Sequence, residues 1–421
     1  MEEILFRNMR IFDGYSSDLK DGLEVLVAGD SIQTIAPLGS NAADKARIID
    51  CKGGTLMPGL IDAHVHVYGA NLNVTRLVQS PMSYVAHYAA RFMQASLNRG
   101  FTTLRDMGGA DVGLSTAIKD GLITSVPRLF YGGRVISQTG GHGDFRTSDH
   151  NLKEEHYCGC GSHVDVLAVV ADGADAARKA VREELRRGAS HIKVMASGGV
   201  ASQTGRLDSC QYSDEEIRTA VDEARRAGSY VGTHCHPTEA VRRSAALGVR
   251  SIEHATFIDE KTADFVADCG AYVVPTMAIV AGLVERGAEL GVTPTSMEKL
   301  KRVAAQANHS LEIMKSAGVK MGFGTDLLGA LSPRQSTEFA LRAEVLPAVD
   351  ILRSACSINA EIMGQSDRLG CIREGAAGDV LVVSGNPLED ISLLGADGRN
   401  LSVILSAGKL HKIAPELTGI R

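Results

Sequence analysis

Short apolar runs alternate with amphipathic stretches over most of the chain. Most of the runs between residues 56 and 364 are separated by segments with helical periodicity. Eight strand-like runs occur, in the order LMPGLIDAHVH, TTLRDMG, RLFYGGRVI, HIKVMASGG, YVGTHCH, SIEHATF, AYVVPTM and KMGFGTD. Eight strands that alternate with helices predict an α/β fold, a parallel (β/α)8 TIM barrel with right-handed crossovers.

Two of the intervening segments have recognisable helix boundaries. DAARKAVREELRRG precedes the fourth run and SDEEIRTAVDEARRAG precedes the fifth. The second segment opens with a predicted capping box of Ser213 and Glu216. Both segments end in glycine, which commonly follows the last turn of a helix.

The two ends of the chain show strand patterns without helices between them. ILFRNMRIF, LEVLVAG and SIQTIAPL lie near the start, and GDVLVVSG, LSVILSAG and KLHKI lie near the end. Chain termini often lie close together at a domain surface. We therefore expect residues 1–55 and 365–421 to form one small β-sandwich domain, beside a barrel domain of residues 56–364.

A long connection, residues 138–172, separates the third predicted strand from its helix. Loops of this length in compact domains are usually functional or mobile. It contains His156, Cys158, Cys160 and His163, but the Cys-x-Cys pair lacks the wider gap usual in structural zinc sites. We expect a loop that folds over the active site and excludes water once substrate binds.

Composition and charge exclude several classes of function. The net charge is −6 and no basic run occurs, so we expect no nucleic-acid partner. The acidic start MEEILFRN has no apolar stretch long enough for a signal peptide, so we expect none. The longest apolar run, residues 271–284, is too short for a membrane span and contains Pro275 and Gly282. The eight cysteines are scattered, which indicates reduced thiols and a cytoplasmic protein without membrane attachment.

Six polar side chains lie on the predicted barrel strands or at their ends: His64, His66, Lys193, His234, His254 and Asp326. The carboxyl ends of barrel strands form the active site of this fold, and an i, i+2 histidine pair shares one strand face. Each residue alone has an ordinary explanation, as a core histidine, a lysine with a packed stem or a helix cap. Burying all six without partners would cost several kcal/mol, so the group predicts bound metal.

The number of ligands indicates two divalent metal ions. Four imidazoles and one carboxylate exceed what a single tetrahedral zinc with an open position needs. A second metal requires a bridging anion, which a neutral Lys193 can supply by reacting with CO2 to form N6-carboxylysine. We predict one metal bound by His64, His66 and Asp326 and another by His234 and His254, with the Lys193 carbamate bridging them. A water between the metals would ionise near neutral pH.

Seven motifs occur in order along nearly the whole chain: MPGLIDAHVHV, FTTLRDMGG, SQTGGHGD, HIKVMASGGVAS, THCHP, SIEHATF and MGFGTDLLG. Together they closely resemble the amidohydrolase superfamily. Within it they resemble the imidazolonepropionase-related branch that contains zinc Xaa-Pro dipeptidases, carboxypeptidase-like dipeptidases and ochratoxin-hydrolysing amidases. The resemblance implies the same six metal positions, two Zn²⁺ ions with a carboxylated lysine, and a homo-oligomer.

The resemblance also implies roles for individual residues. Asp326 would carry a proton from the attacking hydroxide to the leaving nitrogen, and His142 would stabilise the developing oxyanion. Without the resemblance, His142 in GGHGD indicates only an exposed histidine in a glycine-rich turn. Close Xaa-Pro dipeptidases have a tyrosine near the substrate carboxylate where this chain has His236, so proline specificity does not follow. His236 could bind the carboxylate with a pH-dependent charge, or lie at the rim of the site.

Two further segments allow two interpretations each. Residues 332–339 could meet the amine end of a substrate through Gln335 or Glu338, or form a solvated helix start. Arg105 and Asp106, after the second strand, could contact substrate, although a structural ion pair is favoured.

The sequence therefore predicts a binuclear zinc amidohydrolase that hydrolyses the amide bond of dipeptides or N-acyl amino acids. One alternative is a cyclic-amide hydrolase or deaminase with a single metal, which Lys193 disfavours because such relatives generally lack this lysine. The other is a non-catalytic scaffold on the same fold, which the six intact ligand positions disfavour.

Overall fold

The computed structural model describes residues 3–40, 46–146, 167–202 and 205–417. The predicted loop residues His156, Cys158, Cys160 and His163 lie outside these ranges. No helix within the described ranges is both long and apolar enough to cross a membrane.

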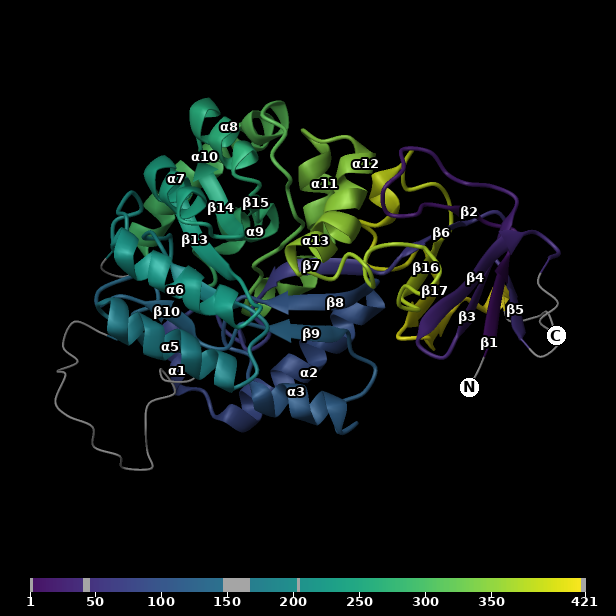
Figure 1. The fold of residues 1–421 in the computed structure, drawn as a ribbon, viewed down its shortest axis with the longest axis horizontal. Helices are drawn as coiled ribbons and strands as arrows, with labels where there is room; N and C mark the ends of the chain where they lie inside the picture. The colour runs from purple at the N-terminus through teal and green to yellow at the C-terminus, as the bar shows by residue number, and fades with distance from the viewer. Residues whose placement is uncertain (1–2, 41–45, 147–166, 203–204, 418–421) are drawn as a thin grey trace.

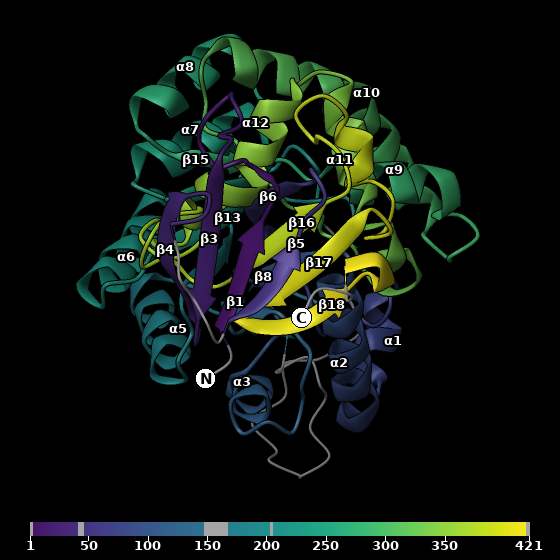
Figure 2. The ribbon, with the colours of Figure 1, turned by 90° about the vertical axis from the view of Figure 1, so that its right-hand side faces the viewer.

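Two sheets at one end of the molecule contain strands from both ends of the chain. The first has the order β4-β3-β1-β5, with bounds Ser31–Pro37, Leu23–Ala28, Glu3–Arg7 and Arg47–Asp50. The second has the order β18-β17-β16-β6-β2, with bounds Lys409–Ile413, Leu401–Ser406, Val380–Val383, Thr55–Pro58 and Arg10–Ile11. Their apolar faces share one core, in which Phe6, Val25, Leu56 and Val403 are buried. Figure 1 shows these strands on the right, and Figure 2 shows purple β1 and β3 in front of yellow β16 and β17.

Two parallel sheets occupy the middle of the chain. One has the order β7-β8-β9, with bounds Leu60–Val65, Phe101–Asp106 and Arg128–Tyr131. The other has the order β11-β10-β12-β13-β14-β15, with bounds Ala168–Val170, Val135–Ser137, Ile192–Met195, Val231–Pro237, Ser251–Phe257 and Tyr272–Val274. The third predicted strand is thus two strands, β9 and β10, that pair with different sheets.

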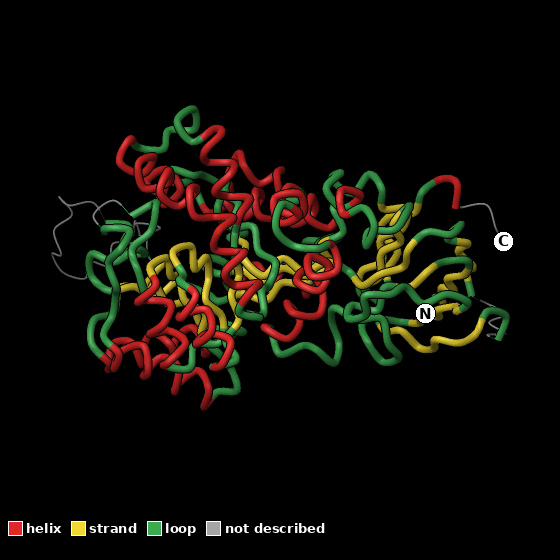
Figure 3. Tube along the Cα trace, turned by 90° about the horizontal axis from the view of Figure 1, so that it is seen from above, coloured by secondary structure: helices red, strands yellow, loops and turns green. Residues whose placement is uncertain are grey.

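Helices surround these parallel strands, as the view from above shows (Figure 3). Those before β15 are α1 Val74–Gln79, α2 Met82–Asn98, α3 Val112–Lys119, α5 Ala174–Arg186, α6 Asp214–Arg226, α7 Thr238–Ala246 and α8 Glu260–Asp268. Those after it are α9 Met277–Arg286, α10 Pro294–Ser316, α11 Thr337–Ala343, α12 Ala348–Arg353 and α13 Asn359–Ile362, with the 3-10 helix η1 at Gly329–Arg334. The predicted capping box is confirmed, because the Ser213 and Glu216 side chains each bond the other's backbone N–H at the start of α6.

The first predicted strand is divided between the two regions. β6 pairs with β16 in the terminal sheets, whereas β7 pairs with β8 in the parallel sheet. Gly59 lies between them, and a Cβ there would lie 2.0 Å from Oγ1 of Thr102, so only glycine fits.

The prediction of a regular eighth strand over residues 320–326 is wrong. Met321 forms a single bridge with Val273, and no described residue from 322 to 326 belongs to a strand. The segment still touches both sheets, because Gly322 N donates to Val273 O and Ala63 N donates to Phe323 O, each at 2.8 Å. Positive φ of 54° at Asp326 is incompatible with continued strand pairing.

Candidate metal centre

Three predicted ligands meet where β7 ends. His64 lies on β7, His66 follows its last residue, and Asp326 approaches from the segment beside it. Possible ligand atoms of these three residues all lie within 4.8 Å of one another. Asp326 Oδ1 lies 3.5 Å from Nε2 of His64 and 3.2 Å from Nε2 of His66.

Hydrogen bonds at Nδ1 define which nitrogen of each of these imidazoles faces Asp326. His64 Nδ1 lies 2.7 Å from the Glu253 carboxylate, and His66 Nδ1 lies 2.9 Å from the carbonyl oxygen of Gly108. Both partners are acceptors when Glu253 is ionised, so Nδ1 carries the proton in each ring. The Nε2 lone pairs then point at the carboxylate of Asp326. Two lone pairs and an anionic oxygen this close repel one another, and a cation between them removes the repulsion, whether it is a metal ion or the proton on His66 Nε2 that the raised pKa of His66 favours.

His234 and His254 continue the cluster. His234 lies on β13 and His254 on β14, and their ring centroids are 4.6 Å apart. The His254 ring is also 5.1 Å from that of His64, so the group is contiguous with the three residues at β7. Nδ1 of His254 lies 2.8 Å from Oγ1 of Thr276, which orients the ring.

A break in strand geometry places two consecutive residues of β14 near the same histidine. The Glu253 carboxylate contacts Nδ1 of His64, while the His254 ring lies 5.1 Å from the same ring, tilted by 49°. Successive residues of a regular strand face opposite sides. Positive φ at His254 (72°) and Ala255 (49°) interrupts that alternation, a strained conformation typical of functional sites.

Lys193 lies on β12, next to the strand that carries His234. Its side chain is 1% exposed, and its register partner on β13 is Gly232. Burial lowers the pKa of the Lys193 ammonium, although Glu253 and Asp326 oppose this shift. A lowered pKa favours the neutral amine, the form that reacts with CO2.

Burial also keeps most of the imidazoles neutral. It lowers the pKa of His64 and of His236 to about 4 and that of His142 to about 3, and it places the pKa of His234 and of His254 well below the usual range. His66 differs: burial opposes its protonation, but the hydrogen bond to Asp326 together with the negative charges of Asp326 and Asp106 raises its pKa. Neutral imidazoles can bind metal without first losing a proton.

A cavity of about 600 Å³ opens beside these groups. Its polar end is lined by His142, His234, His236, His254 and Asp326. Much of the remaining lining comes from α9 and α10: the apolar Met277, Ile279, Val280, Leu283, Leu300 and Val303, and the polar Thr295, Ser296 and Ser310. The arrangement combines a polar site for chemistry with an apolar site for a side chain.

Two further predicted residues lie at the polar end. His142 follows β10, stacks on His234 at 4.2 Å and has Nδ1 2.8 Å from Oγ of Ser202. His236 is 5% exposed, with its ring 5.0 Å from that of His254 and Nδ1 3.1 Å from Oγ1 of Thr256. A Cβ on Gly199 would lie 2.5 Å from Cε1 of His142, so glycine there is needed for the His142 position.

Glu253 was missed in the sequence analysis. It accepts from the fully buried Arg105 at 2.9 Å and also contacts His64. Arg105 therefore pairs with Glu253, while Asp106 accepts backbone N–H groups, including that of Val67. The sequence does contain a feature that could have identified Glu253, because it is a charged residue inside the apolar run SIEHATF.

Both interpretations of residues 332–339 are wrong for Gln335 and Glu338. Each is 0% exposed, so neither lies in a solvated helix start, and neither lines the cavity beside the histidines. Gln335 donates to the buried Asp62, whose other contacts include Thr325. Glu338 accepts from Arg342 and from Ala278 N. Both residues support the backbone around the site.

Comparison with known proteins identifies close similarity over almost the whole chain. The amidohydrolase family profile matches residues 55–410. Ochratoxinase of Aspergillus niger is 30% identical over 406 residues, which cover 92% of this chain and 82% of that protein. The crystal structure of an amidohydrolase is 44% identical with a TM-score of 0.94, covering 98% of this chain and all of that one. A prolidase complexed with N-methylphosphonate-L-proline is 41% identical with a TM-score of 0.93 and the same coverage.

Proposed function

Because the chain belongs to the amidohydrolase family and is a hydrolase of amide bonds, we propose that it cleaves dipeptides or N-acyl amino acids with two divalent metal ions. The substrate proposal draws on two relatives, a prolidase and an ochratoxinase. The apolar side chains of α9 and α10 that line the cavity favour a substrate with a sizeable apolar group on one side of the amide.

The buried donor set fits divalent metal, and zinc in particular. Imidazole nitrogen and carboxylate oxygen are the ligand types that zinc accepts alongside thiolates. We propose that one ion is held by His64, His66 and Asp326 and the other by His234 and His254. Lys193, buried and with a lowered pKa, would bridge them as N6-carboxylysine.

The described side chains support a division of catalytic roles. The bound metals would supply Lewis acidity and lower the pKa of a coordinated water to about 7. Although burial opposes it, the neighbouring His64 and His66 lower the pKa of Asp326, so its carboxylate can accept the proton of the attacking water and deliver it to the leaving nitrogen. The Ser202 hydroxyl can donate to Nδ1 of His142, which leaves the proton on Nε2 for the carbonyl oxygen as it gains negative charge.

His236 is the residue on which we expect specificity for the acid side of the substrate to depend. Burial lowers its pKa to about 4, so near neutral pH it would offer a hydrogen bond rather than a positive charge to a substrate carboxylate. A neutral His236 favours substrates whose binding does not depend on an ion pair with their carboxylate. Substrates with proline, aromatic and basic C-terminal residues must therefore be compared directly.

We also infer how the sheets assemble around the site. The two parallel sheets would form one (β/α)8 barrel, since residues 128–137 pair with both sheets and residues 321–323 bond to β15 and to β7. Residues 1–55 and 365–421 would form the composite sandwich domain and 56–364 the barrel domain, with β6 as the crossing strand. A homo-oligomer remains part of this proposal, and light scattering of the purified chain tests it.

The observation that carries the proposed function is the approach of two imidazole Nε2 atoms to Asp326 Oδ1, at 3.5 and 3.2 Å. The test is a screen of zinc-loaded protein against dipeptides and N-acyl amino acids, with metal content measured on the same samples. We expect about two zinc ions per chain and release of a free amino acid. One metal per chain with deaminase or cyclic-amide activity would support the first alternative, and no metal and no turnover would support the scaffold.

A further inference from the structure

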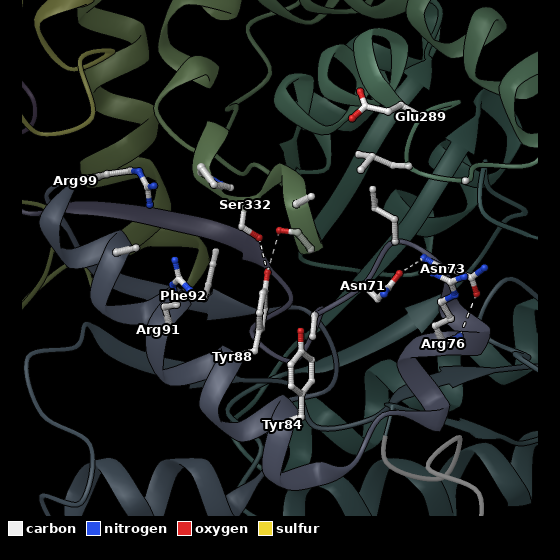
Figure 4. Close-up of a pocket in the computed structure, with 18 residues that line it drawn as sticks. Asn71, Asn73, Arg76, Tyr84, Tyr88, Arg91, Phe92, Arg99, Glu289 and Ser332 are labelled. Atoms are coloured by element: carbon white, nitrogen blue, oxygen red, sulfur yellow. Dashed lines mark hydrogen bonds between the residues drawn. The ribbon is translucent and has the colours of Figure 1, made fainter.

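A second cavity, of about 920 Å³, lies apart from the predicted metal ligands. Its walls come from residues 70–73, from α1 and α2, from η1, and from residues 289–291 before α10 (Figure 4). None of the eight predicted site residues lines it. Leu72, Asn73 and Gly291 line both cavities, so the second one adjoins the first.

One face of α2 forms much of the wall. The lining residues of that face include Tyr84, Tyr88, Arg91 and Ala95, followed by Arg99 at the end of the helix. Their spacing of three or four residues places them along one side of a helix. The opposite side packs into the core through Val85, Ala89, Met93 and Leu97, so the helix presents the lining face at a fixed position.

The cavity has an excess of positive charge. Its charged lining residues are Arg76, Arg91, Arg99 and Glu289. Glu289 is already paired with Arg286, at 2.9 Å, and Arg99 contacts Asp397 at 3.3 Å. Arg76 and Arg91 form no ion pair with any residue in the part of the chain that the structure describes.

The surrounding sequence does not compensate this charge. Residues 63–105, which include α1 and α2, contain neither Asp nor Glu, although the chain has 50 acidic residues and a net charge of −6. A concave surface lined by one sign of charge concentrates the field and attracts oppositely charged ligands. An acidic protein thus contains a cationic cavity along an acid-free segment.

Neutral polar groups and apolar side chains also line the cavity. Tyr84 is 58% exposed, and its hydroxyl points into the cavity between Arg76 on one side and Arg91 on the other (Figure 4). Tyr88 is held in place, because its hydroxyl lies 2.5 Å from Oγ of Ser332 on η1. Guanidinium groups bind carboxylates and phosphates through paired hydrogen bonds, and a phenol can add a third.

We propose that this cavity binds a small organic anion that carries at least two carboxylate or phosphate groups. Arg76 lies on one side of Tyr84 and Arg91 on the other, so a molecule with separated anionic groups can use both sides. The cavity volume, about 920 Å³, is large enough for such a molecule. The proposal does not depend on the function of the metal centre.

The test is calorimetric titration of the full-length, metal-loaded protein at low ionic strength. The probes are inorganic phosphate, succinate and fructose 1,6-bisphosphate, and the variants are Arg76→Ala/Arg91→Ala and, as a matched control, Arg225→Ala on the exposed face of α6. We expect the wild type to bind one fructose 1,6-bisphosphate per chain, more tightly than it binds inorganic phosphate. The double variant should bind the bisphosphate at least about tenfold more weakly than the wild type does. The control should bind like the wild type.

Equal binding to the wild type and the double variant would overturn the proposal, because the anion would then bind elsewhere, such as at the metals. Absence of binding to the wild type would overturn it as well. Light scattering of the same samples supplies a further outcome: if the double variant loses self-association and no probe binds, this face contacts a second copy of the chain rather than an anion. Amide hydrolysis by the double variant verifies that it is folded.

Discussion

His64 Nδ1 lies 2.7 Å from Oε2 of Glu253, and both side chains are almost completely buried. The other carboxylate oxygen of Glu253 accepts from Arg105 at 2.9 Å. One carboxylate therefore fixes the orientation of a predicted metal ligand and neutralises a buried arginine. Partners of this kind commonly set both the tautomer and the basicity of a ligating histidine.

Glu253→Gln should weaken metal binding while leaving a side chain of the same shape. The amide cannot supply the negative charge that holds the proton on Nδ1 of His64 and balances Arg105. We expect a loss of about 10- to 100-fold in metal affinity, measured by zinc titration, and a lower melting temperature. Glu215→Gln, at an exposed position on α6, is the control. Unchanged zinc affinity in Glu253→Gln would show that the contact between Glu253 and His64 does not contribute to metal binding.

Lys193→Ala should abolish amide hydrolysis and reduce the metal content. The truncated residue leaves no nitrogen to form a carbamate, so the bridging anion between the two proposed metals is lost. Zinc content and turnover are measured on the same preparation, with Lys179→Ala on the exposed face of α5 as the control. Near-normal turnover in Lys193→Ala would remove the carbamate from the mechanism.

Gly199→Ala should impair catalysis without removing any proposed ligand. The added methyl carbon would lie 2.5 Å from Cε1 of His142 and 2.8 Å from Nε2 of His234, so both rings must move. A shift near 1 Å at a catalytic group can cost about 100-fold in rate. We expect kcat to fall by about that factor, and Gly113→Ala, at an exposed position in α3, to remain active. Wild-type kcat in Gly199→Ala would argue against a catalytic position for His142.

The metal-free protein should lose stability as the pH falls from 7 toward 4. Burial lowers the pKa of His64 and His236 to about 4, so below the unfolded-state pKa near 6.5 the unfolded chain takes up protons that the folded chain does not. The free energy of unfolding must therefore decrease with falling pH across this window. Urea unfolding at pH 7 and pH 5 measures the change.

A variant isolates one contribution to that pH dependence. His236→Asn removes one histidine with a lowered pKa. It should reduce the decrease in unfolding free energy between pH 7 and pH 5 by about 2 kcal/mol. The comparison uses differences between two pH values, so a uniform effect of the substitution on stability cancels. An identical pH dependence in wild type and variant would show that His236 is not protected from protonation in the folded chain.

Periodicity was sufficient to predict the elements that carry most of the proposed ligands. His64, His234 and His254 lie on strands that the apolar runs indicated, because ladder pairing and burial produce a local pattern. The segment with Asp326 has the same apolar pattern but is not a strand. Its backbone is determined by long-range bonds from Thr325 N and Asp326 N to the carbonyl oxygen of His64, which no local pattern encodes.

The supporting contacts were harder to predict for the same reason. Glu253 and Arg105 are separated by 148 positions and Gln335 and Asp62 by 273, so their pairing depends on the assembled fold. Gln335 and Glu338 belong to a polar sequence that indicates solvent exposure, yet both are fully buried. Gln335 donates to Asp62 and Glu338 accepts from Arg342, contacts that only the tertiary structure reveals.

The adjacency of β6 and β7 has a consequence for the order in which the chain can fold. β6 pairs with β16, whose residues follow it by more than 320 positions, while β7 begins two residues after β6 ends. During synthesis the ribosome must therefore release all the parallel strands before the partner of β6 exists. Until then an apolar strand edge is open to pairing with another molecule, so chaperone capture or aggregation of nascent chains should concentrate on this edge.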